Sequence, residues 1–221
     1  MCYAVAMKIG VFDSGIGGEA VAEALRQLIP GATVVSVSDT ANVPYGGRPR
    51  AEIMKLTKAA VEPLIALDCD AIVIACNTAT TNAIQLLRHD FPTQRLVGLE
   101  PMVKPAAELT KTNVIAVLAT PATLHSPRYQ QLKDEWAQGV TVIEPDCSSW
   151  AELIEHGRSD EIDLEATLTP LIESNVDVIV LACTHYHWIK PAIEKRVGTP
   201  VTVLEPSQAI KNRLVDIIKA S

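Results

Sequence analysis

Short apolar runs alternate with longer amphipathic stretches along almost the whole chain. Two runs stand out: residues 71–75 lead directly into Cys76, and residues 176–182 lead into Cys183. Runs of about four to seven Ile, Val, Leu and Ala residues are typical of strands that are buried on both faces of a parallel sheet. Shorter apolar runs at 8–13, 33–37, 95–99, 113–118, 140–143 and 200–204 predict six further strands.

Helices are predicted between these strands. Their expected positions are 15–28, 50–67, 78–89, near Lys104, from the loop at Thr120 and Pro121 to Trp136, 151–155, from 159 or 160 to 173, 188–196, and from Pro206 to the C-terminal residue. Repeated strand–helix–strand units with short loops form parallel sheets flanked by helices. The sequence therefore predicts an α/β protein.

The pattern restarts near Glu100 and Pro101, which predicts two pseudo-symmetric domains. We expect residues 1–100 with a C-terminal helix 206–221 in the first domain and residues 101–205 in the second. Each domain then holds one strand that ends in a cysteine. Ligands of open α/β sheets bind at the carboxyl ends of the strands. Two facing domains would therefore point Cys76 and Cys183 into a shared cleft, which is the predicted active site.

Composition and charge narrow the possible partners. The chain of 221 residues is 48% hydrophobic and 20% charged, as expected of a folded globular protein. Its formal net charge is −7, and it has no basic run, so nucleic acid is not expected as a partner. We also expect no membrane span, because no stretch approaches ~20 apolar residues, and no signal peptide, which together predict a cytoplasmic protein.

The five cysteines predict reduced thiols. Their number is odd, and they are scattered without a Cys-x-x-Cys pair, which indicates neither a disulfide framework nor a metal site. For Cys69 and Cys147 we expect a structural role as small buried hydrophobic residues. For Cys76 and Cys183, the polar residues that follow them favour a functional role.

A glycine turn at the start of the chain allows a competing interpretation. Gly15, Gly17 and Ala20 follow a strand and open a helix, and Asp39 lies near the end of the next strand. This spacing resembles a relaxed dinucleotide-binding fingerprint. Asp13 argues against it, because a carboxylate beside the turn would repel a diphosphate. The same geometry could instead bind a small carboxylate at the helix N-terminus.

Four sequence blocks together carry a family resemblance. They are Phe12-Asp13-Ser14-Gly15-Ile16-Gly17-Gly18, Asp39-Thr40-Ala41-Asn42-Val43-Pro44-Tyr45-Gly46, Ala75-Cys76-Asn77-Thr78-Ala79 and Cys183-Thr184-His185-Tyr186. In order and spacing they resemble the signature blocks of the glutamate racemases, within the cofactor-independent aspartate/glutamate racemase superfamily. The resemblance spans nearly the whole chain.

The resemblance implies a function and roles for particular residues. The implied activity is racemisation of an acidic amino acid, L-glutamate to D-glutamate for peptidoglycan precursors, by two thiols and without a cofactor. Cys76 would take the proton from the D-enantiomer with help from Asp13, and Cys183 from the L-enantiomer with help from Glu155 and His185. The implied substrate-binding residues are Ser14, Pro44, Tyr45, Gly46, Asn77, Thr78, Thr120, Thr123 and Thr184. Members of this family commonly form dimers, so the resemblance also implies a possible homodimer.

The chemistry of the residues agrees with this implication. Inverting an α-carbon requires one group that removes a proton from one face and a second group that delivers a proton to the other face. Cys76 and Cys183 on opposed sheets could supply both groups, provided that the thiol that acts as base is ionised.

Departures from the family pattern keep alternatives open. His187 and Trp188 follow Tyr186, where the family generally has proline and an aliphatic residue. The substrate could therefore be aspartate or another amino acid. A second alternative is a non-catalytic ligand-binding or regulatory protein that has kept the cleft.

Overall fold

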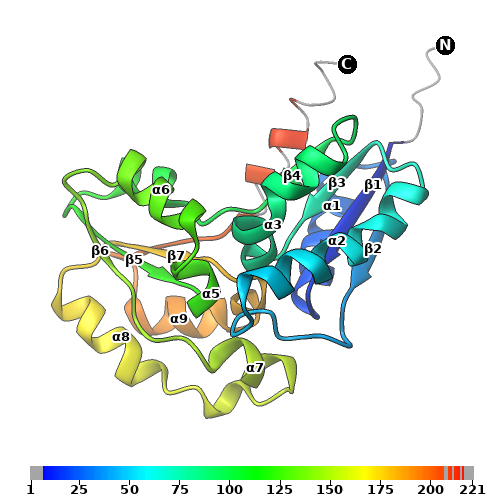
Figure 1. Ribbon diagram of the computed structural model, residues 1–221. Helices are drawn as coiled ribbons and strands as arrows, with labels where there is room; N and C mark the ends of the chain where they lie inside the picture. The colour runs from blue at the N-terminus through cyan, green and yellow to red at the C-terminus, as the bar shows by residue number, and fades with distance from the viewer. Residues whose placement is uncertain (1–6, 207–208, 211, 215, 217–221) are drawn as a thin grey trace.

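The chain forms two parallel four-stranded sheets, each flanked by helices. The computed structural model describes residues 7–206, 209–210, 212–214 and 216. Figure 1 shows the two sheets in separate halves of the molecule, joined by the segment that follows β4. The predicted α/β class with two sheets is confirmed.

The first half has the strand order β2-β1-β3-β4. Its strands are β1 (Lys8–Asp13), β2 (Thr33–Ser38), β3 (Ala71–Ile74) and β4 (Leu96–Gly98), and its helices are α1 (Gly17–Leu28), α2 (Arg50–Ala66) and α3 (Asn77–Asp90). The central strands β1 and β3 pair in parallel and are almost completely buried, which explains their apolar sequences.

The second half repeats this topology with the order β6-β5-β7-β8. Its strands are β5 (Val114–Leu118), β6 (Thr141–Ile143), β7 (Val178–Leu181) and β8 (Thr202–Leu204). Its helical elements are α4 (Val103–Leu109), α5 (Pro121–Leu124), α6 (Pro127–Trp136), α7 (Trp150–Glu155), η1 (Ser159–Glu161), α8 (Leu164–Glu173), η2 (Thr184–Ile189) and α9 (Lys190–Val197). The strands that precede the two cysteines, β3 and β7, hold equivalent places in their sheets.

Three predicted helices of the second half begin later than expected or are divided. The helix predicted to reach Trp136 is divided into α5 and α6, because Ser126 caps a new helix by accepting a hydrogen bond from the backbone N–H of Tyr129. The helix predicted from residue 159 starts at Leu164, where the Asp163 carboxylate caps it. The helix predicted from residue 188 starts at Lys190, after a 3-10 segment.

The two sheets suggest where the chain divides. The segment between Gly98 and Val103 connects them, and we propose the boundary near Glu100 and Pro101. The helix predicted for residues 206–221 lies partly outside the described residues. Of its described side chains, Ile210 and Leu214 are buried in one cluster with residues of β1, α1 and β3. We therefore propose that this segment belongs with the first half.

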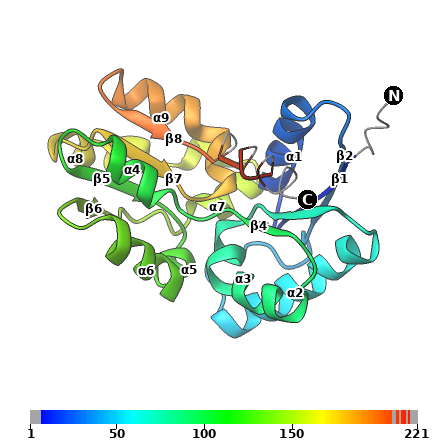
Figure 2. The ribbon, with the colours of Figure 1, turned by 90° about the horizontal axis from the view of Figure 1, so that it is seen from above.

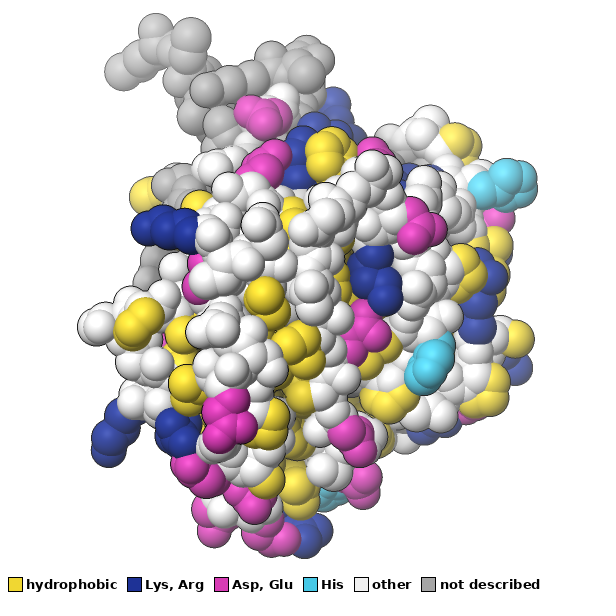
Figure 3. Space-filling view, turned by 90° about the vertical axis from the view of Figure 1, so that its left-hand side faces the viewer, with side chains coloured by type: hydrophobic (Ala, Val, Ile, Leu, Met, Phe, Trp, Pro, Cys, Tyr) yellow, Lys and Arg dark blue, Asp and Glu magenta, His cyan; other side chains and the backbone are white. Residues whose placement is uncertain are grey.

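The surface carries charges of both signs. Figure 3 shows acidic side chains gathered on the lower part of one face of the molecule, with basic side chains among them. Within the described ranges, no helix is both long and apolar enough to cross a membrane.

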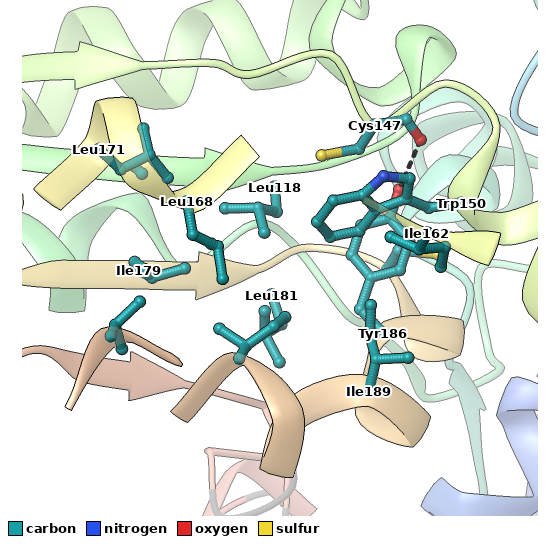
Figure 4. Close-up of a cluster of buried hydrophobic side chains, with 14 of the residues drawn as sticks. Leu118, Cys147, Trp150, Ile162, Leu168, Leu171, Ile179, Leu181, Tyr186 and Ile189 are labelled. Carbon is teal, nitrogen blue, oxygen red and sulfur yellow. Dashed lines mark hydrogen bonds between the residues drawn. The ribbon is translucent and has the colours of Figure 1, made fainter. Parts of the chain in front are cut away.

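One apolar cluster of the second half lies between its sheet and helices α7, α8 and α9, and a second lies between the sheet and helices α4 and α6. Figure 4 shows Leu118, Leu181, Trp150 and Tyr186 pointing into one cluster. The Trp150 and Tyr186 rings meet edge to face with centroids 5.4 Å apart, and the Tyr186 hydroxyl donates to the backbone oxygen of Cys147 at 3.1 Å. These contacts hold the segment that follows Cys183 against α7 and the loop before it.

We expect Leu118→Ala to destabilise the protein by about 2–5 kcal/mol, because Leu118 is fully buried and its truncation would leave a cavity. Urea denaturation followed by circular dichroism measures this loss. Leu109→Ala is the control, because Leu109 is 52% exposed, and its loss should stay within about 0.5 kcal/mol. Equal losses in the two variants would contradict this assignment of the core.

Candidate active site

Cys76 lies at the junction between β3 and α3. The strand ends at Ile74, and Cys76 is the residue that caps the helix: its Sγ accepts a hydrogen bond from the backbone N–H of Ala79 at 3.4 Å. The Ser14 hydroxyl lies 3.3 Å from the same sulfur. Both neighbours can donate a hydrogen bond to a thiolate, and the helix N-terminus favours negative charge.

Cys183 occupies the matching junction between β7 and η2. The strand ends at Leu181, and the Cys183 sulfur lies 3.7 Å from Nδ1 of His185. The other ring nitrogen, Nε2, bonds to the Glu155 carboxylate at 2.5 Å. Because a carboxylate only accepts, Nε2 carries a hydrogen, and Nδ1 of a neutral ring is left to accept the S–H of Cys183. Glu155, His185 and Cys183 thus form a chain along which a proton can move.

Both cysteines line one small enclosed pocket between the two halves. Its other lining residues are Ser14, Pro44, Tyr45, Gly46, Asn77, Thr78, Thr120, Ala151, Thr184 and His185. Three of the residues implicated from the sequence lie behind this lining: Asp13, Glu155 and Thr123. Each of them contacts a lining residue through a hydrogen bond.

The two carboxylates behind the lining each bond to the opposite half. Asp13, at the end of β1, accepts from the Thr184 hydroxyl at 2.9 Å and from the backbone N–H of Gly15 at 2.9 Å. Glu155, at the end of α7, accepts from the backbone N–H of Ile16 at 3.1 Å as well as from His185. The side chain of Glu155 is only 8% exposed, so Glu155 is not a solvated residue of the helix surface.

Hydroxyl groups close the other side of the pocket. The Thr78 Oγ1 of α3 lies 2.8 Å from Oγ1 of Thr120 and 3.2 Å from Oγ1 of Thr123, both in the second half. Next to them the backbone N–H of Ala122 donates to the backbone oxygen of Gly46 at 2.9 Å. A Cβ at Gly46 would lie 2.8 Å from Thr120, so a glycine is required for this approach.

The loop that carries Pro44, Tyr45 and Gly46 is braced by charged residues. The Tyr45 hydroxyl donates to Asp39 at 2.6 Å, and Nε of Arg48 donates to the backbone oxygen of Asn42 at 2.9 Å. Asp39 is therefore a support for Tyr45 in this structure.

Burial governs the acidity of the central groups. It raises the pKa of Cys76 to about 11, with a further contribution from the charge of Asp13. It also raises the pKa of Cys183 well above the ordinary value, with Cys76 as the next cause. The pKa of Asp13 is raised as well, because the cost of burying its charge exceeds the effect of nearby His185. Burial therefore favours the neutral thiols of Cys76 and Cys183 until a cation enters the pocket.

One polar atom in the pocket lacks a partner. The side-chain nitrogen of Asn77 is buried, and among the described residues it makes no hydrogen bond. An amide N–H donor in this position can satisfy a carboxylate of a ligand. Within the described part of the chain, no three or more His, Cys, Asp or Glu side chains are arranged so that they could hold a metal ion.

Two contributors to this site were missed from the sequence. Ala151 lines the pocket from α7, four residues before Glu155, so helical spacing could have placed it on the same face. The backbone N–H of Ile16, which bonds to Glu155, could not be predicted, because every residue type except proline has this group.

The glycine turn is covered by the second half. A Cβ at Gly17 would lie 2.5 Å from Thr184, so η2 covers the N-terminus of α1. The dinucleotide interpretation is wrong for this reason.

The sequence is similar to a known protein family and to proteins of known activity. The family model described as Asp/Glu/Hydantoin racemase matches residues 18–213. Glutamate racemase of Roseiflexus sp. is 40% identical over 97% of this chain and 80% of its own length. Glutamate racemase of Aliarcobacter butzleri is 39% identical over 96% of this chain and 84% of its own length.

Solved structures that resemble this fold also include glutamate racemases. The structure of Escherichia coli glutamate racemase in complex with L-glutamate and the activator UDP-MurNAc-ala superposes with a TM-score of 0.84 at 27% identity, covering 96% of this chain and 82% of that one. The Francisella tularensis glutamate racemase in complex with D-glutamate gives a TM-score of 0.82 at 28% identity, covering 97% and 82%.

Proposed function

Because the chain belongs to the Asp/Glu/Hydantoin racemase family, we propose that it interconverts L- and D-glutamate by a two-thiol mechanism. D-glutamate made in this way would serve peptidoglycan synthesis, as is typical of the family. The observation that carries the proposal is that Cys76 and Cys183, from matching strand ends of the two halves, line one pocket.

The proposed reaction uses each thiol in turn as base and acid. The thiolate of Cys76 takes the α-proton of D-glutamate, and the thiol of Cys183 gives its proton to the opposite face of the same carbon. The product is L-glutamate, with Cys76 now protonated and Cys183 ionised. The reverse reaction exchanges the two roles, so protons and charge balance in both directions.

The substrate itself favours ionisation of the thiols. Burial raises the pKa of both cysteines, and the α-ammonium group of a bound amino acid would place a positive charge beside them. Hydrogen bonds from Ser14 and Ala79 also favour the thiolate of Cys76. For Cys183, His185 can accept the thiol proton, and Glu155 stabilises the imidazolium that results.

Hydrogen bonds can stabilise the carbanion without a cofactor. Negative charge formed at the α-carbon is shared with the α-carboxylate, so donors aimed at that group lower the barrier. The unpartnered Asn77 amide is one such donor. The hydroxyls of Thr78, Thr120 and Thr184 line the same pocket.

Isotope exchange tests this proposal. The protein is incubated in D₂O with L- and D-glutamate and with L- and D-aspartate, while optical rotation and loss of the α-proton signal are followed. We expect both glutamate enantiomers to reach a racemic mixture with complete α-deuteration. Faster turnover of aspartate would contradict glutamate as the substrate, and no exchange with any of the four would refute the racemase assignment.

We expect Glu155→Gln to reduce kcat/KM by about 10–100-fold in both directions, because the neutral amide no longer stabilises protonated His185. The two reductions must be equal, since the enantiomers have equal free energies. The proton transfer at Cys183 becomes slower than that at Cys76. The primary isotope effect should therefore rise for L-glutamate deuterated at the α-carbon and fall for the D-enantiomer.

Glu152→Gln is the matched control for this variant. Glu152 lies on the same helix, one turn before His156, and is exposed. Its replacement should leave kcat/KM and both isotope effects unchanged. Isotope effects that change equally for the two enantiomers in Glu155→Gln would show that Glu155 does not serve Cys183 in particular.

A further inference from the structure

A groove lies between the two halves beside the enclosed pocket. It consists of two adjoining hollows that share Arg50, Asn82 and Pro127. Its walls are α2 and α3 of the first half and α5 and α6 of the second, which lie next to one another in Figure 2. Gly46 lines both the groove and the enclosed pocket, so the two adjoin at the seam where Gly46 meets Thr120 and Ala122 of the second half.

The charge of this groove is opposite to that of the protein. Its lining includes Arg48, Arg50, Arg128 and His125, and no carboxylate is among the described residues that line it. The chain as a whole has 26 acidic and 19 basic residues, so such a surface is not expected from composition. A cationic hollow in an acidic protein concentrates small anions locally.

Arg50 differs from the other two arginines. Arg48 pairs with Glu52 and braces the loop before it, and Arg128 holds both carboxylate oxygens of Glu100. No hydrogen bond or ion pair of Arg50 is found within the described part of the chain. Its guanidinium is therefore available to bind a carboxylate through two parallel hydrogen bonds.

Helix termini add to the positive potential. Helix α2, of 17 residues, begins at Arg50, and α6, of 10 residues, begins at Pro127. The positive ends of both helix dipoles thus lie at the groove. Nδ1 of His125 donates to the backbone oxygen of Pro121 at 2.8 Å, which holds the imidazole ring beside the groove.

We infer that this groove is an outer binding site for acidic amino acids, where Arg50 holds the side-chain carboxylate before the substrate passes the Gly46 seam into the enclosed pocket. The inference rests on the proposed function for the identity of the ligand. The seam must open for this passage, because Ala122 N–H bonds to the Gly46 oxygen and Thr120 packs against Gly46. Arg50 thus captures the substrate and takes no part in proton transfer.

Steady-state kinetics of an Arg50→Gln variant test the capture role. We expect kcat/KM for L-glutamate to fall about fivefold to tenfold at low ionic strength through a higher KM, with kcat little changed, and the difference to shrink above about 0.5 M salt as charges are screened. Arg50→Lys should recover most of the loss. Lys55→Gln removes an exposed cation from the same helix outside the groove and should behave as the unsubstituted protein.

Binding to the groove can be measured without inversion of the substrate. L-glutamate is titrated into Cys76→Ser protein while the ring signals of His125 are followed by nuclear magnetic resonance. We expect a saturable shift that is lost when Arg50→Gln is added and is weaker with L-glutamine. An equal shift with and without the Arg50→Gln substitution, or an unchanged KM in Arg50→Gln, would overturn the outer site. Absence of racemisation by the unsubstituted protein would instead overturn the proposed function.

Discussion

Replacement of either Cys76 or Cys183 by serine should reduce racemisation by at least about 100-fold, because each variant lacks one of the two acid/base groups. The two losses should differ in kind. In Cys76→Ser, the remaining Cys183 can still exchange the α-proton of L-glutamate, and in Cys183→Ser the remaining Cys76 can still exchange that of D-glutamate. Proton magnetic resonance in D₂O, combined with chiral chromatography, separates exchange from inversion.

Cys69→Ser is the control for these variants. Cys69 is also buried, at 5% exposure, but it lies before β3, at the opposite end of the strand from Cys76. Its replacement should leave racemisation unchanged. If one cysteine variant exchanged both enantiomers equally, a single base would be acting on both faces, and the opposed geometry would not be the basis of the reaction.

Gly17→Ala should reduce kcat/KM about tenfold or more although the substitution adds only one methyl group. The new Cβ would lie 2.5 Å from Oγ1 and 2.6 Å from Cβ of Thr184, which cannot retreat because its backbone carbon is 2.9 Å away. The N-terminus of α1 and η2 must then separate. That separation breaks the hydrogen bond from Thr184 to Asp13 and widens the pocket around both thiols.

Stability should fall by only about 1–2 kcal/mol, because loss of the Thr184–Asp13 hydrogen bond costs about 1.5–3 kcal/mol and the higher helix propensity of alanine recovers up to about 1 kcal/mol. The expected result is therefore a folded protein of low activity, seen by thermal denaturation and racemisation assays together. Gly47→Ala is the control, because nothing lies within 4 Å of the Cβ it would add. Full activity in Gly17→Ala would show that the close approach of α1 and η2 is not needed for turnover.

The strands were predictable because burial on both faces leaves a strong mark in sequence. β3 and β7 are entirely buried, and their runs of Ile, Val and Leu predicted both position and environment. Helix starts in the second half were less predictable. They depend on which polar residue caps the helix, and Ser126 and Asp163 compete with several other serines and acids nearby.

The site was predictable where the chemistry lies in side chains of consecutive motif residues. Cys76, Asn77 and Thr78 are brought into the pocket by the turn from β3 into α3, so proximity in sequence became proximity in space. Contacts between the halves could not be predicted in this way. The bond from Ile16 to Glu155 joins residues 139 positions apart, and it uses a backbone group that every residue type except proline has.

The crossed arrangement of the two buried carboxylates has a consequence for the catalytic cycle. Asp13 accepts a hydrogen bond from the second half, and Glu155 accepts one from the first. Hydrogen bonds to charged groups contribute about 1.5–3 kcal/mol each. A hinge movement that admits glutamate has to break both bonds together with the Gly46 seam, so the open form is the minor one at equilibrium. Product release should therefore become slower as the solvent is made more viscous, even where proton transfer is fast.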